Sequence, residues 1–196
     1  MPTGVALRDV REQLFDAAER ILLREGQQAL TSRSVTAEAG VAKGVLHRHF
    51  ADFDAFLADL VTDRIGRVEQ QSAALREAAG SGTVEGNLAE ALTEVFSSVA
   101  VAVVALVTAR DGLRARLRAE GHGGIPLLAE ATDMLAGYLR AERGLGRLAP
   151  DADTATLAMM LVGTGHLLFA GRRPGTVPEA AEVGTVVRTV LAGVVR

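Results

Sequence analysis

The side chains best suited to chemistry gather between residues 31 and 50, where basic and hydrogen-bonding groups follow a helical spacing. Side chains three and four residues apart share one face of a helix, so the apolar and polar positions of this stretch separate onto two faces. We predict a short helix from about Ala42 with an inward face of Val45, Leu46 and Phe50. Its outward face would then carry Lys43, Gly44, His47, Arg48 and His49.

A second short helix is predicted just upstream of the first. Thr31 or Ser32 can cap it by accepting a hydrogen bond from a free backbone N–H, and Val35 and Ala39 give it an apolar edge. Gly40 follows, where the end of a helix favours a residue that tolerates a left-handed backbone. Two short helices joined by a glycine turn, with a basic outer face on the second, suit entry into the major groove of DNA. The candidate DNA contacts are Thr31, Arg33, Ser34, Lys43, Gly44, His47, Arg48 and His49.

Residues 31–50 resemble the helix-turn-helix of the TetR (tetracycline-repressor) family of bacterial transcription regulators. The stretch Thr31 to Ala39 is similar to the first helix of that motif, Ala39-Gly40-Val41 to its turn, and Lys43 to Phe50 to its recognition helix. The resemblance covers about residues 8 to 60. It implies a ligand-responsive repressor that binds a palindromic double-stranded DNA operator as a homodimer. A small, largely apolar effector would release the repressor from that operator.

Four positions depart from the family's pattern. Ala42 and Val45 stand where the family usually has Ser or Thr, His47 stands where it usually has Tyr, and Phe53 where it usually has Lys. Each missing group commonly contacts phosphate, so the departures bear on the strength of DNA binding more than on the fold. They leave open a second interpretation, a regulator-derived ligand-binding or interaction protein with weakened DNA binding.

The charge of the whole chain does not by itself indicate nucleic-acid binding. The net charge is −3, and residues 1–50 hold seven Lys and Arg against six Asp and Glu, which leaves fourteen against eighteen in the remainder. Any basic surface must therefore be local. Lys43 is the only lysine in the chain. The presence of a single lysine reflects either a composition that is biased toward Arg or an ammonium group that is retained to bind phosphate.

The apolar spacing predicts an all-α protein of about nine helices. The family resemblance implies that three of them form a DNA-binding head and that the rest form a larger domain for effector binding and dimerisation. We place the head at residues 1–52, with its motif at 31–50, and the second domain at 53–196. The fifth helix is expected to run from about Thr83 through the apolar stretch that ends at Val107. Asp151 is expected to cap the eighth helix, and a capping box from Thr176 to Glu179 the ninth.

The last two predicted helices, at about residues 151–170 and 176–194, are apolar over most of their surface. A chain of this size cannot easily hide several such helices within one subunit, so we expect them to form a four-helix bundle with a second copy. Gly163 and Gly165 would allow the helices to approach closely. The alternative is that these helices are simply core. The expected interface residues are Leu161, Leu168, Val187 and Leu191.

The family resemblance implies an effector pocket among the fifth, seventh and eighth helices. Tyr138 and His166 could fix a polar group in an otherwise apolar cavity. The alternative for each candidate is a place in the core, which for His166 would mean a hydrogen-bonded core histidine. The candidates by residue type are Phe96, Met134, Tyr138, Met159, His166 and Phe169.

No pattern predicts catalysis, a metal site or a cofactor. The chain has no cysteine, and His47 and His49 point apart on a helix, which makes a poor metal pair. The longest apolar run, from Val99 to Val107, is shorter than the roughly 20 residues that span a bilayer. The N-terminal stretch carries charges throughout. We therefore expect a cytoplasmic protein that is not an enzyme and has no membrane partner.

Overall fold

The protein folds entirely into helices in a computed structural model, which describes residues 4–97, 99–172 and 176–196. This confirms the predicted all-α class. Within those residues, Leu148 and Val195 form one isolated β-bridge and no strand is present. The elements are α1 (Gly4–Glu25), the 3-10 helix η1 (Gln27–Ala29), α2 (Ser32–Glu38), α3 (Gly44–His49), α4 (Phe53–Glu77), α5 (Val84–Phe96), α6 (Ala100–Ala109), α7 (Asp111–Ala119), α8 (Leu128–Gly144), α9 (Thr154–Ala170) and α10 (Ala180–Val190).

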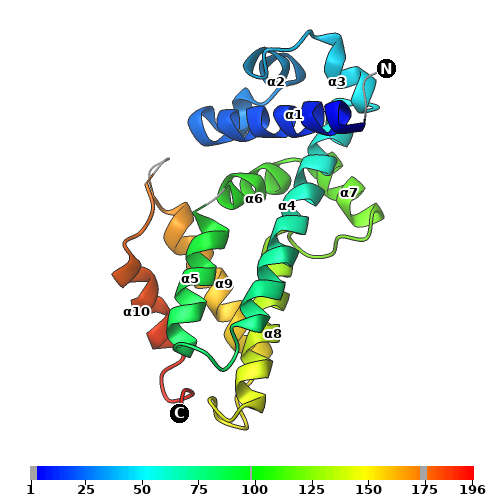
Figure 1. Cartoon of the computed structure of the whole chain (residues 1–196). Coiled ribbons are helices and arrows are strands. Elements are labelled where there is room, and N and C mark those ends of the chain that lie inside the picture. The colour runs from blue at the N-terminus through cyan, green and yellow to red at the C-terminus, as the bar shows by residue number, and fades with distance from the viewer. Residues whose placement is uncertain (1–3, 98, 173–175) are drawn as a thin grey trace.

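The elements are arranged as a small head above a longer helical body (Figure 1). Helices α1, α2 and α3 form the head at one end, while α5, α8, α9 and α10 lie together at the other. The 25-residue α4 runs from the head into the body over about 38 Å, at 1.5 Å per residue. Helices α6 and α7 lie beneath the head, where α6 packs on α1 and α7 packs on α4.

Three phenylalanine rings join the head to the start of α4. The rings of Phe15 and Phe50 lie 6.0 Å apart between centroids, and Phe56 lies 5.6 Å from Phe15 and 5.0 Å from Phe50. All three side chains are buried. Aromatic pairs at this spacing add to the stabilisation from burial, so the first turns of α4 are fixed to the head.

The predicted fifth helix is wrong, because the structure divides it into α5 and α6 with an angle of 55° between them. Helix α5 ends at Phe96, although the Ser97 N–H still donates to the Thr93 carbonyl. Helix α6 is almost wholly apolar, and a straight continuation would carry it out of the core. The bend places it between head and body, where Val103 and Leu106 are fully buried. Sequence periodicity shows no break, because both segments are apolar on the inward side.

Two predicted helix starts are also wrong, and the count rises to ten α-helices among the described residues. Asp153, not Asp151, caps α9 by accepting from the Ala155 and Thr156 N–H groups at 3.2 and 3.1 Å. Residues 149–152 form a turn first. Helix α10 begins only at Ala180, where the Glu182 carboxylate accepts from the Glu179 N–H. Pro178 disfavours a helical backbone at the residue before it, which delays this start.

Among the described residues, no single helix is both long and apolar enough to cross a bilayer. Helices α5 and α6 reach that length only as a bent pair.

Candidate nucleic-acid interface

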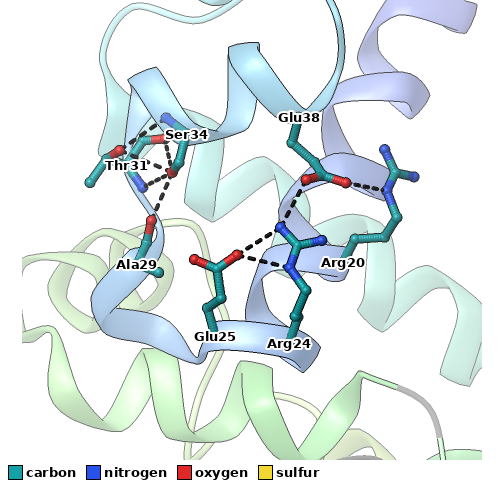
Figure 2. Close-up of polar contacts among 7 residues, drawn as sticks. All are labelled: Arg20, Arg24, Glu25, Ala29, Thr31, Ser34 and Glu38. Carbon is teal, nitrogen blue, oxygen red and sulfur yellow. Dashed lines mark hydrogen bonds and ion pairs between the residues drawn. The ribbon is translucent and has the colours of Figure 1, made fainter.

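The start of α2 is held by two hydroxyl groups (Figure 2). The Thr31 hydroxyl accepts from the Ser34 N–H at 3.1 Å, and the Ser34 hydroxyl accepts from the Thr31 N–H at 2.9 Å. Ser34 also donates to the Ala29 carbonyl at 2.7 Å. Between the two predicted caps, the structure therefore selects Thr31. Thr31 stays exposed, whereas Ser34 is half-buried and committed to this cap.

The other end of α2 is tied to α1 through Glu38 (Figure 2). Its carboxylate accepts from Arg20 Nε at 2.8 Å and from Arg24 Nη2 at 2.9 Å. These two hydrogen bonds lower the pKa of Glu38 to about 2. Sequence reasoning missed this anchor, because its members lie 14 and 18 residues apart and follow no local spacing.

The turn between α2 and α3 has the predicted left-handed residue. Gly40 has φ 68°, and the Val41 N–H closes the helix end by donating to the Thr36 carbonyl at 3.0 Å. Gln13 of α1 adds a hydrogen bond to the Ala39 carbonyl at 2.9 Å. Helix α3 then starts at Gly44, two residues later than expected. This packing fixes the angle at which α3 is presented.

The outward face of α3 is where the sequence placed it. Lys43, His47 and Arg48 are exposed, while Leu46 is fully buried beneath them. A side chain built at Gly44 would meet open space. His49 lies at the edge of this face, half-buried, with its ring centroid 6.4 Å from that of Phe50.

The cations of this face lack the partners that neutralise their neighbours. Arg11, Arg20 and Arg24 of α1 are all ion-paired, to Asp59, Glu38 and Glu25. Among the residues that the structure describes, Arg33, Lys43 and Arg48 form no ion pair. The segment from α2 to α3 therefore carries three exposed cations that no described carboxylate neutralises, although the chain as a whole is acidic.

The unusual Phe53 has a packing role. Its ring stacks on Phe56 with centroids 5.6 Å apart, and the Arg110 guanidinium lies 5.8 Å from its centroid. The flanking carboxylates are also engaged, Asp54 with Arg110 at 3.6 Å and Asp52 with Arg116 at 3.1 Å. Arginines from the α6–α7 corner and α7 thus occupy the first turn of α4, which the family resemblance had suggested for a phosphate contact.

The predicted effector residues do not form one cluster. Phe96, His166 and Phe169 lie together, with the Phe96 centroid 5.9 and 5.8 Å from the other two rings. Met134 and Tyr138 are buried on α8, where the Tyr138 hydroxyl accepts from Asn87 Nδ2 at 2.8 Å. Met159 is 61% exposed, so its placement in an internal pocket is wrong.

Burial has opposite effects on the two polar candidates. It raises the pKa of Tyr138 and lowers the pKa of His166, because each group is held in its neutral form. The expected alternative of a hydrogen-bonded core histidine is not what the structure shows, since His166 Nδ1 is buried with no hydrogen-bond partner among the described residues.

The predicted interface residues lie mostly inside their own subunit. Leu161, Val187 and Leu191 are 0–2% exposed, and Leu168 is half-buried. Helix α10 packs on both α5 and α9, so this stripe fills the core of one chain. Leu161, Val187 and Leu191 are therefore core residues, whereas Leu168 stays a predicted interface residue. The outward face of α9 carries Met159, Met160 and Leu167 instead, the last of them 73% exposed.

Residues 14–60, which contain the helix pair and its supports, match the family described as bacterial regulatory proteins, tetR family. Residues 14–60 thus carry the tetR-family segment. The helix-turn-helix geometry described above falls wholly within this matched segment. Among the described residues, no group of three or more His, Cys, Asp or Glu side chains could hold a metal ion.

Known proteins resemble this chain in two ways. The HTH-type transcriptional regulator PksA of Bacillus subtilis (strain 168) is 32% identical over 72 residues, in a match that covers 33% of this chain. The match spans only 35% of that relative's length. Reduced NemR of E. coli superposes with a TM-score of 0.73 at 15% identity, over 94% of this chain and 96% of NemR. FadR of Bacillus subtilis in complex with stearoyl-CoA gives 0.66 at 19% identity, over 93% and 98%. At these identities, the likeness shows the fold of the whole chain.

Proposed function

We propose that the chain is a transcriptional repressor that binds a palindromic DNA operator as a homodimer and is released by a small molecule. The observation that carries the proposal is the set of unpaired cations on the outer side of α2 and α3, namely Arg33, Lys43 and Arg48. DNA binding depends on neutralising phosphates, and these three cations are free to do so. Residues 1–52 would serve as the DNA-binding domain and residues 53–196 as the effector and dimerisation domain.

The proposed DNA contacts are of two kinds, to phosphate and to a base edge. Arg33 on α2 and Lys43 at the start of α3 are assigned to phosphate, while Arg48 is assigned to a base edge in the major groove. Thr31, Ser34, Gly44, His47 and His49 complete the surface. Gly44 has no side chain, so its backbone can approach DNA closely. The space around it is open, since an added Cβ would have no neighbouring protein atom within 4 Å.

Dimerisation would use the outward face of α9. Met159, Met160 and Leu167 are exposed there, and Gly163 lies between them on the same side. Contiguous exposed apolar side chains on a soluble protein mark an interaction surface, and a second copy of the chain offers the same surface in return. Two heads held by such a dimer could reach successive major grooves, about 34–36 Å apart.

Effector binding would act through the contacts between body and head. Arg110 donates to the Leu30 carbonyl at 3.4 Å and pairs with Asp54, while Arg116 pairs with Asp52, the cap of α4. A ligand that displaces α6 or α7 therefore also displaces the first turn of α4, next to α3. The fold can hold a ligand, as the stearoyl-CoA complex of Bacillus subtilis FadR illustrates.

The test is whether the protein retards DNA from its own promoter at moderate salt and whether the complex dissolves at high salt. Retardation that falls steeply with salt supports the proposal. Ala42 and Val45, which lack the hydroxyls usual at their positions, favour the alternative of a ligand-binding or interaction protein with weakened DNA binding. Failure to retard promoter DNA, and failure to select any sequence from random DNA, would decide for that alternative.

A further inference from the structure

A hollow opens between α4, α5 and α8 in the middle of the body. Its volume is about 230 Å³, which is below the roughly 300–1,000 Å³ usual for small-molecule sites and suits a small ligand. Most of its wall is apolar. The lining residues are Gln71, Ala74, Leu75, Ala78, Asn87, Glu90, Ala91, Glu94 and Met134.

The charged groups of this hollow are all of one sign. Glu90 and Glu94 lie one turn apart on α5, and no Lys, Arg or His lines the hollow. Neither carboxylate has an ion pair among the described residues. Like charges four residues apart on a helix repel each other, so a cation between them would relieve that repulsion.

The neutral polar groups of the hollow also favour a donor over an acceptor. Asn87 Nδ2 already donates to the Ser81 carbonyl at 3.0 Å and the Tyr138 hydroxyl at 2.8 Å. Because this amide donor is already used, a ligand donor suits this part of the hollow better than a ligand acceptor.

We propose that this hollow binds a cation with an apolar body, such as a hydrophobic amine or quaternary ammonium compound. The apolar part contacts Leu75, Ala91 and Met134, and the positive group lies between Glu90 and Glu94. The regulatory consequence rests on the proposed function, in which such a cation would be the effector. A second hollow under α1 and α6 shows no such preference, because its Arg64 is paired with Glu19.

Binding is tested by calorimetry without DNA, using three probes of one shape. These are 4-phenylbutylamine, a cation at pH 7, the neutral 4-phenylbutan-1-ol and the anionic 4-phenylbutanoate. We expect the amine to bind most tightly and the carboxylate most weakly. Replacing both Glu90→Gln and Glu94→Gln should weaken amine binding about tenfold and leave alcohol binding unchanged, since exposed ion pairs contribute modestly.

Two controls separate the site from general charge effects. The double variant Glu120→Gln with Asp151→Asn removes the same charge at exposed positions away from the hollow and should not change amine binding. Ala74→Phe, at an exposed lining position, should weaken all three probes by filling the mouth. Circular dichroism verifies that each variant is folded.

The outcomes are distinguishable from those of the proposed function. Absence of amine binding, equal binding of the alcohol or carboxylate, or an equal loss in the control double variant would overturn the cation site. DNA retardation without any probe is measured separately and decides the proposed function alone. If the amine lowered operator affinity in the wild-type protein but not in the Glu90→Gln, Glu94→Gln variant, this result would link the cation site to the proposed function.

Discussion

At the scale of single residues, partners decide which basic side chains are available to DNA. Helix α1 carries several arginines, but Arg20 and Arg24 are bound to Glu38, whereas Arg33, Lys43 and Arg48 form no ion pair with the residues that the structure describes. The sequence could place the outward side chains of α3 from helical spacing alone. It could not show which cations are neutralised, because the Glu38 pairs join residues far apart in the chain.

The unpaired cations predict two kinds of loss in operator binding. Arg33→Ala and Lys43→Ala should each weaken binding to every sequence and flatten the salt slope by about one unit, because each removes one phosphate contact. Arg48→Ala should cost about 1–3 kcal/mol and relax specificity at one base pair. Affinity and salt dependence are measured by fluorescence anisotropy on operator and scrambled DNA.

The matched control for these variants is Arg118→Ala, which removes an exposed cation without an ion pair from the end of α7. It should leave operator binding unchanged. Unaltered affinity in the Lys43→Ala, Arg48→Ala double variant would show that α3 is not the recognition helix.

The lowered pKa of Glu38 predicts a dependence of stability on pH. Because this pKa falls from 4.5 to about 2 on folding, the contribution of Glu38 is complete above about pH 4.5 and is lost as the pH falls toward 2. Glu38→Gln should therefore be less stable than wild type at pH 7, with a difference that shrinks below pH 4.5. Urea unfolding at several pH values measures it. Glu25→Gln removes a neighbouring partner of Arg24 and should keep the wild-type dependence of stability on pH. A stability difference between Glu38→Gln and wild type that did not vary with pH would contradict this assignment.

At the scale of elements, local signals were sufficient where the chain's own capping groups decide the structure. The Thr31 cap and the Gly40 turn both form as expected. The break between α5 and α6 could not be predicted, because it depends on the space between head and body. The same holds for Phe53, whose stacking partner is local but whose cation, Arg110, comes from the α6–α7 corner.

The contacts of Arg110 and Arg116 with the start of α4 predict a variant that binds DNA but no longer responds to ligand. Exposed ion pairs contribute about 0.2–1 kcal/mol, so Arg110→Ala with Arg116→Ala should fold normally. Operator affinity should persist, while its loss on addition of a bound ligand should shrink. Arg114→Ala is the control, because its partner Asp111 lies on the same helix. A full ligand response in the double variant would show that coupling takes another route.

At the scale of the whole molecule, sequence reasoning predicted an apolar surplus in the last two helices but not which side of them it covers. Leu161 and Met159 are both apolar positions on α9, yet one is fully buried and the other is 61% exposed. Periodicity cannot separate them, because α9 is apolar nearly all round. The packing of α5, α6, α8 and α10 against α9 determines which stripe remains outside.

That outer stripe predicts two separable effects of charge on assembly. Leu167→Arg and Met159→Arg place a charge on the exposed face of α9, so each should give a folded monomer if this face forms the dimer, because burying an unpaired charge is costly. Val187→Arg, at a fully buried position, should instead destabilise the subunit itself. Light scattering measures assembly and circular dichroism measures folding. Leu145→Arg, at a 58% exposed position on the turn after α8, is the control and should remain dimeric.

Because a monomer carries one head, Leu167→Arg should also lose tight binding to a two-site operator while keeping weak, salt-sensitive binding to a half-site. A dimeric Leu167→Arg protein would exclude this face, and a monomer that kept full operator affinity would show that the two heads bind independently.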